Sequence, residues 1–220
     1  MTTIRIWDFP TRFFHWALAL SVIGLVITGN VGGNAMVWHF RLGYCVGSLI
    51  IFRIFWGFAG GFWSRWKQFA LSPMTLMNYL FSKGPQASYL GHNPTGSWSV
   101  LLILLFLSAQ VGSGFISDDE IANAGPLTHL VSEKTIQWAT YWHKEIGKTV
   151  ILILVAMHVL AIAWYFHIKK VNLLRSMLTG DKSTLEEAPA SLDRPIDWLK
   201  ALLVIGISAY FIYRLVNLGP

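Results

Sequence analysis

The chain has 220 residues and a formal net charge of +6, and 54% of its residues are hydrophobic while only 13% are charged. No basic patch is interleaved with aromatic residues, so the positive charge does not indicate nucleic-acid binding. Instead, apolar runs near the roughly 20 residues that a membrane span needs recur along the chain. They lie at residues 13–31, 37–59, 98–116, 149–168 and 199–218. We therefore predict an all-α integral membrane protein with five transmembrane helices.

The distribution of Lys and Arg predicts the orientation, because cytoplasmic segments carry an excess of these residues. With the N-terminus inside, most basic residues, among them Arg65, Lys67, Lys169 and Lys170, lie in inner segments. We expect a cytoplasmic N-terminus and, after five spans, a C-terminus on the outer side.

The first predicted span opens with the sequence RFFHW, which places His15 about one helical turn inside the inner surface. The second span begins on the outer side, with His39 near the outer surface. It also carries Gly43 and Gly47, a spacing that allows close helix packing or, alternatively, makes room for a flat ring. The single cysteine, Cys45, lies in this span, so no disulfide forms within the chain.

The inner connection at residues 60–97 contains a segment, Thr75–Phe81, that we expect to form an amphipathic helix at the membrane interface. After the third span, the outer loop 117–142 begins with the acidic run Asp118, Asp119 and Glu120. This run can steer a basic partner by surface charge; a merely solvated loop is the alternative.

The fourth span carries two histidines, His143 and His158, which are fifteen residues apart. In a helix this spacing gives a rise of roughly 22 Å and a phase offset of about 60°, so both imidazoles lie on one side, one near each bilayer surface. An ionisable side chain inside a membrane is costly and is functional by default. Depth therefore pairs His15 with His158 near the inner surface and His39 with His143 near the outer surface.

Two pairs of histidines at two depths predict two haems, each with two axial imidazoles. The chain has no C-x-x-C-H motif, so the haems are expected to be bound noncovalently, as b-type haems. A zinc site would instead need its ligands clustered within a few ångströms. A proton relay or a hydrogen bond between helices is the alternative role for a single histidine. We do not expect His92, His129 or His167 to be ligands.

Other residues fit such haems. Gly29 lies on nearly the same face as His15 but at the outer depth, where it clears space for the outer ring. Arg53 lies at the inner depth on the face of His39, and a buried arginine needs an anion such as a haem propionate. Arg12 and Arg41 are close to the two predicted sites and can serve the same purpose.

The chain resembles a known family in a combination of motifs, which are WDFPTRFFHW, a histidine opening the second span, GHNPTGSWSV, and HKEIG followed by LVAMH. Over about residues 4–180 it is similar to the bacterial cytochrome b-561 family and to the membrane cytochrome b subunit of nickel–iron hydrogenases. The resemblance implies a four-helix transmembrane bundle in the bacterial inner membrane, with two b haems bound at the positions of His15, His39, His143 and His158. It also implies electron transfer between the quinone pool and a periplasmic or membrane redox partner, such as a cytochrome c or a hydrogenase.

The sequence departs from the family pattern in two places. The fourth span is one residue longer, and we expect a register adjustment near Glu145 to accommodate it. The fifth span lies outside the haem-binding core and can dock a partner. We therefore predict a dihaem domain at residues 1–180, and a linker with an extra C-terminal transmembrane helix at residues 181–220.

The resulting functional prediction is an electron-transfer subunit rather than a stand-alone oxidoreductase. One alternative is a quinone-linked oxidoreductase that acts directly on a small substrate such as superoxide. Its quinone would need a pocket with a few polar groups, for which Ser108, Gln110 and Ser113 are candidates. The other alternative is a haem-free transporter or scaffold, which would show no b-type absorption.

Overall fold

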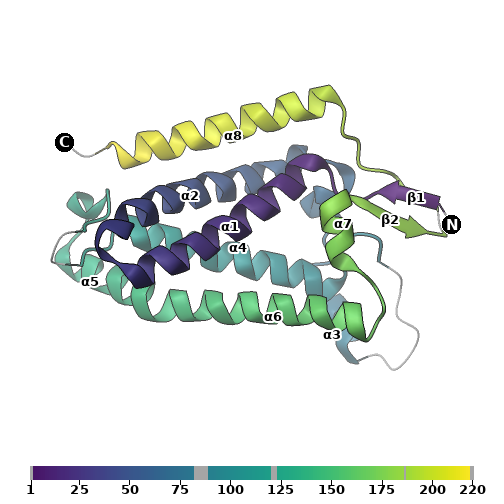
Figure 1. Cartoon of the computed structure of the whole chain (residues 1–220), viewed down its shortest axis with the longest axis horizontal. Coiled ribbons are helices and arrows are strands. Elements are labelled where there is room, and N and C mark those ends of the chain that lie inside the picture. Colours follow the sequence, from purple (N-terminus) through teal and green to yellow (C-terminus); the bar gives the residue numbers. More distant parts are fainter. Residues whose placement is uncertain (1, 82–88, 120–122, 186, 219–220) are drawn as a thin grey trace. The chain divides into compact units, whose positions relative to one another are not determined.

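A computed structural model describes residues 2–81, 89–119, 123–185 and 187–218 (Figure 1). Within these residues, five helices are long and apolar enough to cross a membrane, which confirms the predicted all-α membrane fold. They are α1 (Phe9–Val31), α2 (Met36–Ala59), α4 (Pro94–Phe115), the helix that runs from Glu133 to His167, and α8 (Pro195–Val216).

The fourth of these helices begins much earlier than its apolar run. It consists of α5 (Glu133–Tyr141), the π-helix η5 (Trp142–Gly147) and α6 (Lys148–His167). The loop predicted at residues 117–142 was therefore too long, because the residues from Glu133 onward are helical. Charged residues such as Lys144 and Glu145 precede the apolar run, but the helix continues through them. Ser132 caps its start, because the backbone N–H of Thr135 donates to Ser132 Oγ at 3.3 Å.

Shorter elements connect the spans. They are β1 (Thr2–Arg5), η1 (Gly33–Ala35), η2 (Phe62–Ser64), η3 (Trp66–Gln68), α3 (Pro73–Phe81), η4 (Thr128–Leu130), α7 (Leu173–Thr179) and β2 (Asp181–Thr184). Helix α3 confirms the short helix expected at Thr75–Phe81, and its apolar side chains Met74, Met77 and Phe81 are exposed.

The two strands were not predicted. β1 pairs antiparallel with β2 in a register that joins Thr2 to Thr184 and Arg5 to Asp181. Two four-residue strands so far apart along the chain leave no local hairpin signal, because only the tertiary fold brings them together.

The chain forms two compact units, each built from three separate stretches. The first unit comprises the residues up to Phe13, Ile54–Ile103 and Leu154–Ala201, and the second comprises Phe14–Arg53, Leu104–Ile153 and the residues from Leu202 onward.

A buried carboxylate organises the first unit. Asp8 is 1% exposed, and its Oδ1 accepts from the backbone N–H of Thr11 at 2.7 Å and from Trp56 Nε1 at 3.2 Å. Its Oδ2 accepts from the backbone N–H of Gly61 at 3.0 Å and from Ser64 Oγ at 2.7 Å. A Cβ at position 61 would overlap Asp8 Oδ2, so glycine is needed there. Asp8 therefore caps α1 and also holds the segment that follows α2.

Replacing Asp8 by alanine is expected to destabilise the protein by on the order of 3 kcal/mol, because the substitution leaves four donors in a buried site without their acceptor. Thermal denaturation in detergent measures the effect. Glu187→Ala removes an exposed carboxylate from the same unit and should leave the melting temperature unchanged. Equal melting of Asp8→Ala and the wild type would show that the carboxylate does not hold this unit together.

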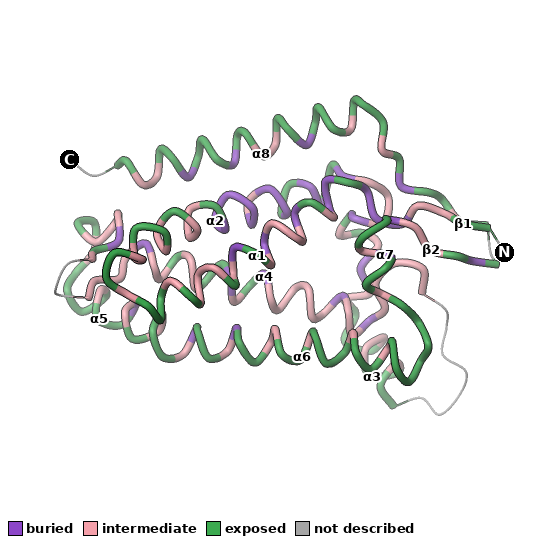
Figure 2. Tube along the Cα trace, in the orientation of Figure 1, coloured by how far each residue is buried: buried purple, intermediate pink, exposed green. Residues whose placement is uncertain are grey.

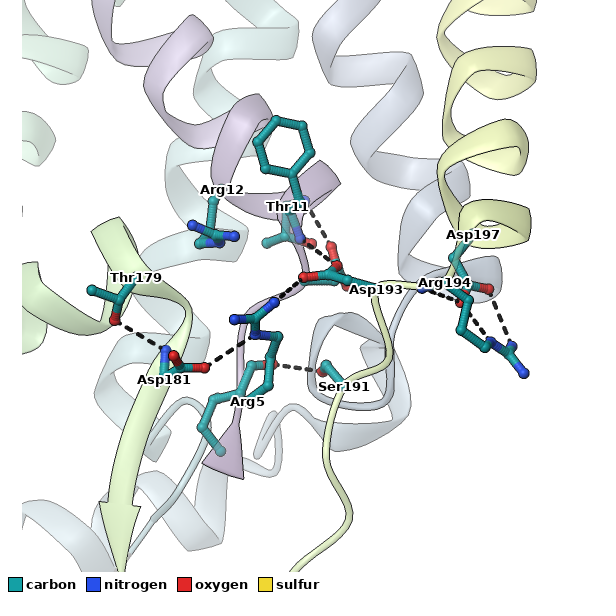
Figure 3. Close-up of polar contacts among 12 residues, drawn as sticks. Arg5, Thr11, Arg12, Thr179, Asp181, Ser191, Asp193, Arg194 and Asp197 are labelled. Atoms are coloured by element: carbon teal, nitrogen blue, oxygen red, sulfur yellow. Dashed lines mark hydrogen bonds and ion pairs between the residues drawn. The ribbon is translucent and has the colours of Figure 1, made fainter. Parts of the chain in front are cut away.

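A second polar cluster joins the N-terminal strand to the segment before α8 (Figure 3). Arg5 pairs with Asp181 at 3.0 Å and with Asp193 at 2.7 Å, and these hydrogen bonds raise the pKa of its guanidinium. Asp193 also accepts from the backbone N–H of Phe9 at 2.8 Å, and Ser191 Oγ donates to the carbonyl of Ile6 at 2.6 Å. The segment that leads into the fifth span is thereby attached to the start of the first.

In the second unit, α2 is the helix with the most buried side chains (Figure 2). Those buried in this unit include Val46, Leu49, Ile50 and Phe52. A Cβ at Gly47 would lie 3.1 Å from Ile212 of α8 and 3.4 Å from Val111 of α4. Of the two interpretations of the glycine pair, close helix packing therefore applies at Gly47.

Candidate haem site

The structure brings two of the predicted histidines together in the second unit. His39 lies in the first turn of α2 and His143 lies in η5, and their ring centroids are 6.0 Å apart with an angle of 82° between the ring planes. At roughly 2.0 Å per metal–nitrogen bond, two imidazoles on opposite sides of one metal have centroids about 6 Å apart. The separation therefore fits two axial ligands of one iron.

Both rings are held through the same nitrogen. His39 Nδ1 lies 3.1 Å from the carbonyl oxygen of Leu25, and His143 Nδ1 lies 2.9 Å from the carbonyl oxygen of Gln110. A carbonyl oxygen only accepts, so Nδ1 carries the proton in each ring and donates it. Nε2 is then the nitrogen that would bind an iron, and the Nδ1 hydrogen bond orients the ring and would raise its basicity toward a metal.

The residues that hold the two rings share one local pattern. Thr28 Oγ1 lies 3.3 Å from His39 Nδ1, and Ser113 Oγ lies 3.4 Å from His143 Nδ1. A Cβ at Gly29 would lie 3.1 Å from His39 Cε1, and one at Gly114 would lie 2.9 Å from His143 Cε1. Each ring thus lies against a carbonyl, a hydroxyl and a glycine of the preceding span. The three residues that supply these groups have the same sequence spacing in both spans. We call these the α1 cradle (Leu25, Thr28 and Gly29) and the α4 cradle (Gln110, Ser113 and Gly114).

The sequence analysis did not identify the cradles, and it named three of their six residues only for other roles. Gly29 was expected to clear space for a haem ring, whereas in the structure it clears space for the imidazole of His39. Leu25, Thr28 and Gly114 were not identified as site residues, and Gln110 and Ser113 were named only as candidates for a quinone pocket. The available signal was a Thr-Gly or Ser-Gly pair near the end of the span that precedes each ligand helix.

The register adjustment expected near Glu145 is confirmed, because the residues from Trp142 to Gly147 form a π-helix. A π-bulge holds one more residue than an α-helical turn and is frequent at functional sites. Within it the carbonyl of His143 accepts from Gln110 Nε2 at 2.9 Å. A Cβ at Gly147 would overlap Gln110 Oε1, so the last residue of the π turn has to be small.

The other predicted pair is divided between the units. His15 lies on α1 in the second unit, where its ring meets the edge of Trp16 at 5.1 Å between centroids, and His158 lies on α6 in the first unit. The pairing of His15 with His158 stays a prediction. Gly43 lies one turn after His39, and a Cβ there would meet no atom within 4 Å, so the position has room for a flat ring.

The three predicted propionate partners differ in their surroundings. Arg12 Nη1 donates to the carbonyl of Leu178 at 2.6 Å, while its buried Nε has no hydrogen-bond partner among the described residues. Arg41 is exposed, and its guanidinium lies 5.1 Å from the ring centroid of Trp38. In the sequence, Arg41 follows His39 by two residues and Trp38 directly precedes it. Arg53 is 3% exposed. Their role toward propionates stays a prediction.

The remaining histidines have other environments. The ring of His92 lies 4.6 Å from that of Trp7 and 4.7 Å from that of Phe69, within the first unit. His129 and His167 are exposed.

The acidic run at Asp118, Asp119 and Glu120 is only partly described. The backbone N–H of Asp118 donates to Thr140 Oγ1 at 3.0 Å, and Asp119 Oδ2 accepts from Asn123 Nδ2 at 2.7 Å. Glu120 lies outside the described residues. The steering of a basic partner by these acidic residues stays a prediction.

The residues of the second unit fit a b-type haem. Two imidazoles at a suitable separation carry their protons on the nitrogens that face the protein. When bound, such a haem supplies reversible one-electron transfer.

Comparisons with known proteins agree with this chemistry. The chain matches the family described as prokaryotic cytochrome b561 over residues 6–180. It is also similar to proteins named probable Ni/Fe-hydrogenase B-type cytochrome subunit. One, from Bradyrhizobium diazoefficiens, is 23% identical, with 82% of this chain and 86% of the relative aligned. Another, from Rhizobium leguminosarum bv. viciae, is 24% identical, with 82% and 89% aligned. No solved structure matches the chain. The chain therefore belongs to the prokaryotic cytochrome b561 family and is a multi-pass membrane cytochrome of the b type.

Proposed function

We propose that this protein carries electrons between the quinone pool and a redox partner through two noncovalent b haems. The observation that carries the proposal is the pair His39 and His143, held by matching cradles with the two Nε2 atoms left for one iron. His39 and His143 would hold the haem on the outer side, and Arg41, two residues from His39, is the propionate partner proposed there.

The second haem is proposed from the sequence, with His15 and His158 as its ligands and with Arg12 and Arg53 as candidate propionate partners. The orientation proposed from the basic residues, with the N-terminus cytoplasmic, makes this the inner haem. Electrons would then cross the membrane between two fixed sites.

The names of the relatives support a hydrogenase as the redox partner, since both relatives are named as cytochrome subunits of Ni/Fe-hydrogenases. A periplasmic cytochrome c is the other partner proposed. Membership in a cytochrome family argues against the haem-free transporter.

A groove in the second unit supports a role for a quinone. It is an open surface groove with a volume of about 370 Å³, lined mainly by apolar and aromatic side chains, including Trp138 and Trp142, together with the hydroxyl residues Ser113 and Thr135. Ser113 also belongs to the α4 cradle, so the groove reaches a residue in contact with His143.

Purified protein is expected to contain two b haems per chain, both extractable with acidic acetone because neither is covalently bound. A pyridine haemochrome assay and a redox titration measure the content and the number of components. A single haem per chain, or haem that resists extraction, would contradict the proposal. Reduction of both components by a quinol, or by a hydrogenase with hydrogen, identifies the partners.

A further inference from the structure

The two cradles differ at one position, the residue whose carbonyl accepts from the histidine. In the α1 cradle this residue is Leu25, whose side chain has no polar atom. In the α4 cradle it is Gln110, whose carbonyl accepts from His143 Nδ1 and whose Nε2 donates to the backbone carbonyl of His143, each at 2.9 Å. Gln110 thus contacts both the ring and the backbone of one histidine.

The side chain of Gln110 is also inserted into the π turn. Its Oε1 lies where a Cβ of Gly147 would be, and Trp142 Nε1 lies 2.8 Å from that same position. The turn from Trp142 to Gly147 therefore closes around the amide of Gln110. An α-helical turn is the default for this backbone, so a π turn needs stabilising contacts of this kind.

We propose that Gln110 is a positioning residue, which keeps the π turn in place and thereby sets the orientation of the His143 ring. The proposal rests on the proposed function, in which His143 is an axial ligand. Relaxation of the π turn would move the extra residue along the helix and rotate the backbone of His143, because each residue contributes about 100° of helical rotation. The ring would then meet the iron at a different angle.

Gln110→Leu tests the proposal with the residue that the α1 cradle already has. It keeps the carbonyl, the hydroxyl and the glycine of the α4 cradle and removes only the amide. Gln110→Met keeps the length and most of the volume of the side chain without a strong donor. Both variants are expected to retain two haems and to shift the midpoint potential and the largest g value of the outer haem, while the inner haem stays unchanged. The g value responds to the angle between the two axial rings.

Gln137→Leu is the matched control, because Gln137 is exposed on α5 in the same unit, and it should leave both spectra unchanged. If Gln110→Met has the wild-type potential and g value, the side chain acts by packing alone and the proposal is wrong. Loss of a haem in His39→Ala and His143→Ala, together with a wild-type spectrum in Gln110→Met, would reject this inference and leave the proposed function intact. A wild-type protein without haem would reject the proposed function itself.

Discussion

Alanine at position 39 or at position 143 is expected to remove one haem, the same one in both variants, so that the haem content falls to about half. The two rings lie 6.0 Å apart, and each is held by its own cradle, so the loss of either leaves one imidazole where the iron needs two. A redox titration of each variant should show that the same component has disappeared. His15→Ala and His158→Ala are expected to remove the other component.

His129→Ala serves as the control, because His129 is exposed and is not among the predicted ligands. It should keep both components and the wild-type haem content. Loss of different components in His39→Ala and His143→Ala would show that these histidines serve different irons, in spite of their proximity.

Deletion of Glu145 is expected to be tolerated, with two haems per chain and a melting temperature near that of the wild type. Glu145 is exposed within the π turn, and the turn holds one residue more than an α-helical turn. Removing one residue turns it into an α-helical turn and leaves the flanking helices in phase. The deletion removes the contact between Gln110 and the turn, so a changed spectrum is expected for the haem proposed at His39 and His143.

Deletion of Ile153 is the matched comparison, because it removes an exposed residue from the regular part of the same span. There the deletion rotates one side of the helix by about 100° and shifts it by about 1.5 Å, which breaks the packing and the ligand geometry together. This variant should lose haem and should accumulate poorly in the membrane. If the two deletions behave alike, the π turn does not accommodate the extra residue.

The sequence alone determined the spans, and it predicted the depth of the histidines. Apolar runs of membrane length persist without any tertiary information, because lipid requires them along the whole span. Histidine depth then follows from chain direction and from the rise per residue. His39 and His143 could therefore be paired before their contact was known. The extra residue near Glu145 could be located because it is a matter of spacing along one helix.

Tertiary structure decided what holds the two rings. The cradles depend on backbone carbonyls of Leu25 and Gln110, and the identity of a side chain does not reveal which carbonyl a histidine will meet. Gly29 lies beside the ring of His39, a neighbour that the sequence did not indicate, since a pattern indicates that space is needed and not which group fills it. The β1–β2 pair and three of the four partners of Asp8, namely Trp56, Gly61 and Ser64, likewise join residues that are distant along the chain. Contacts of this kind arise when separate helices pack, so no local pattern in the sequence records them.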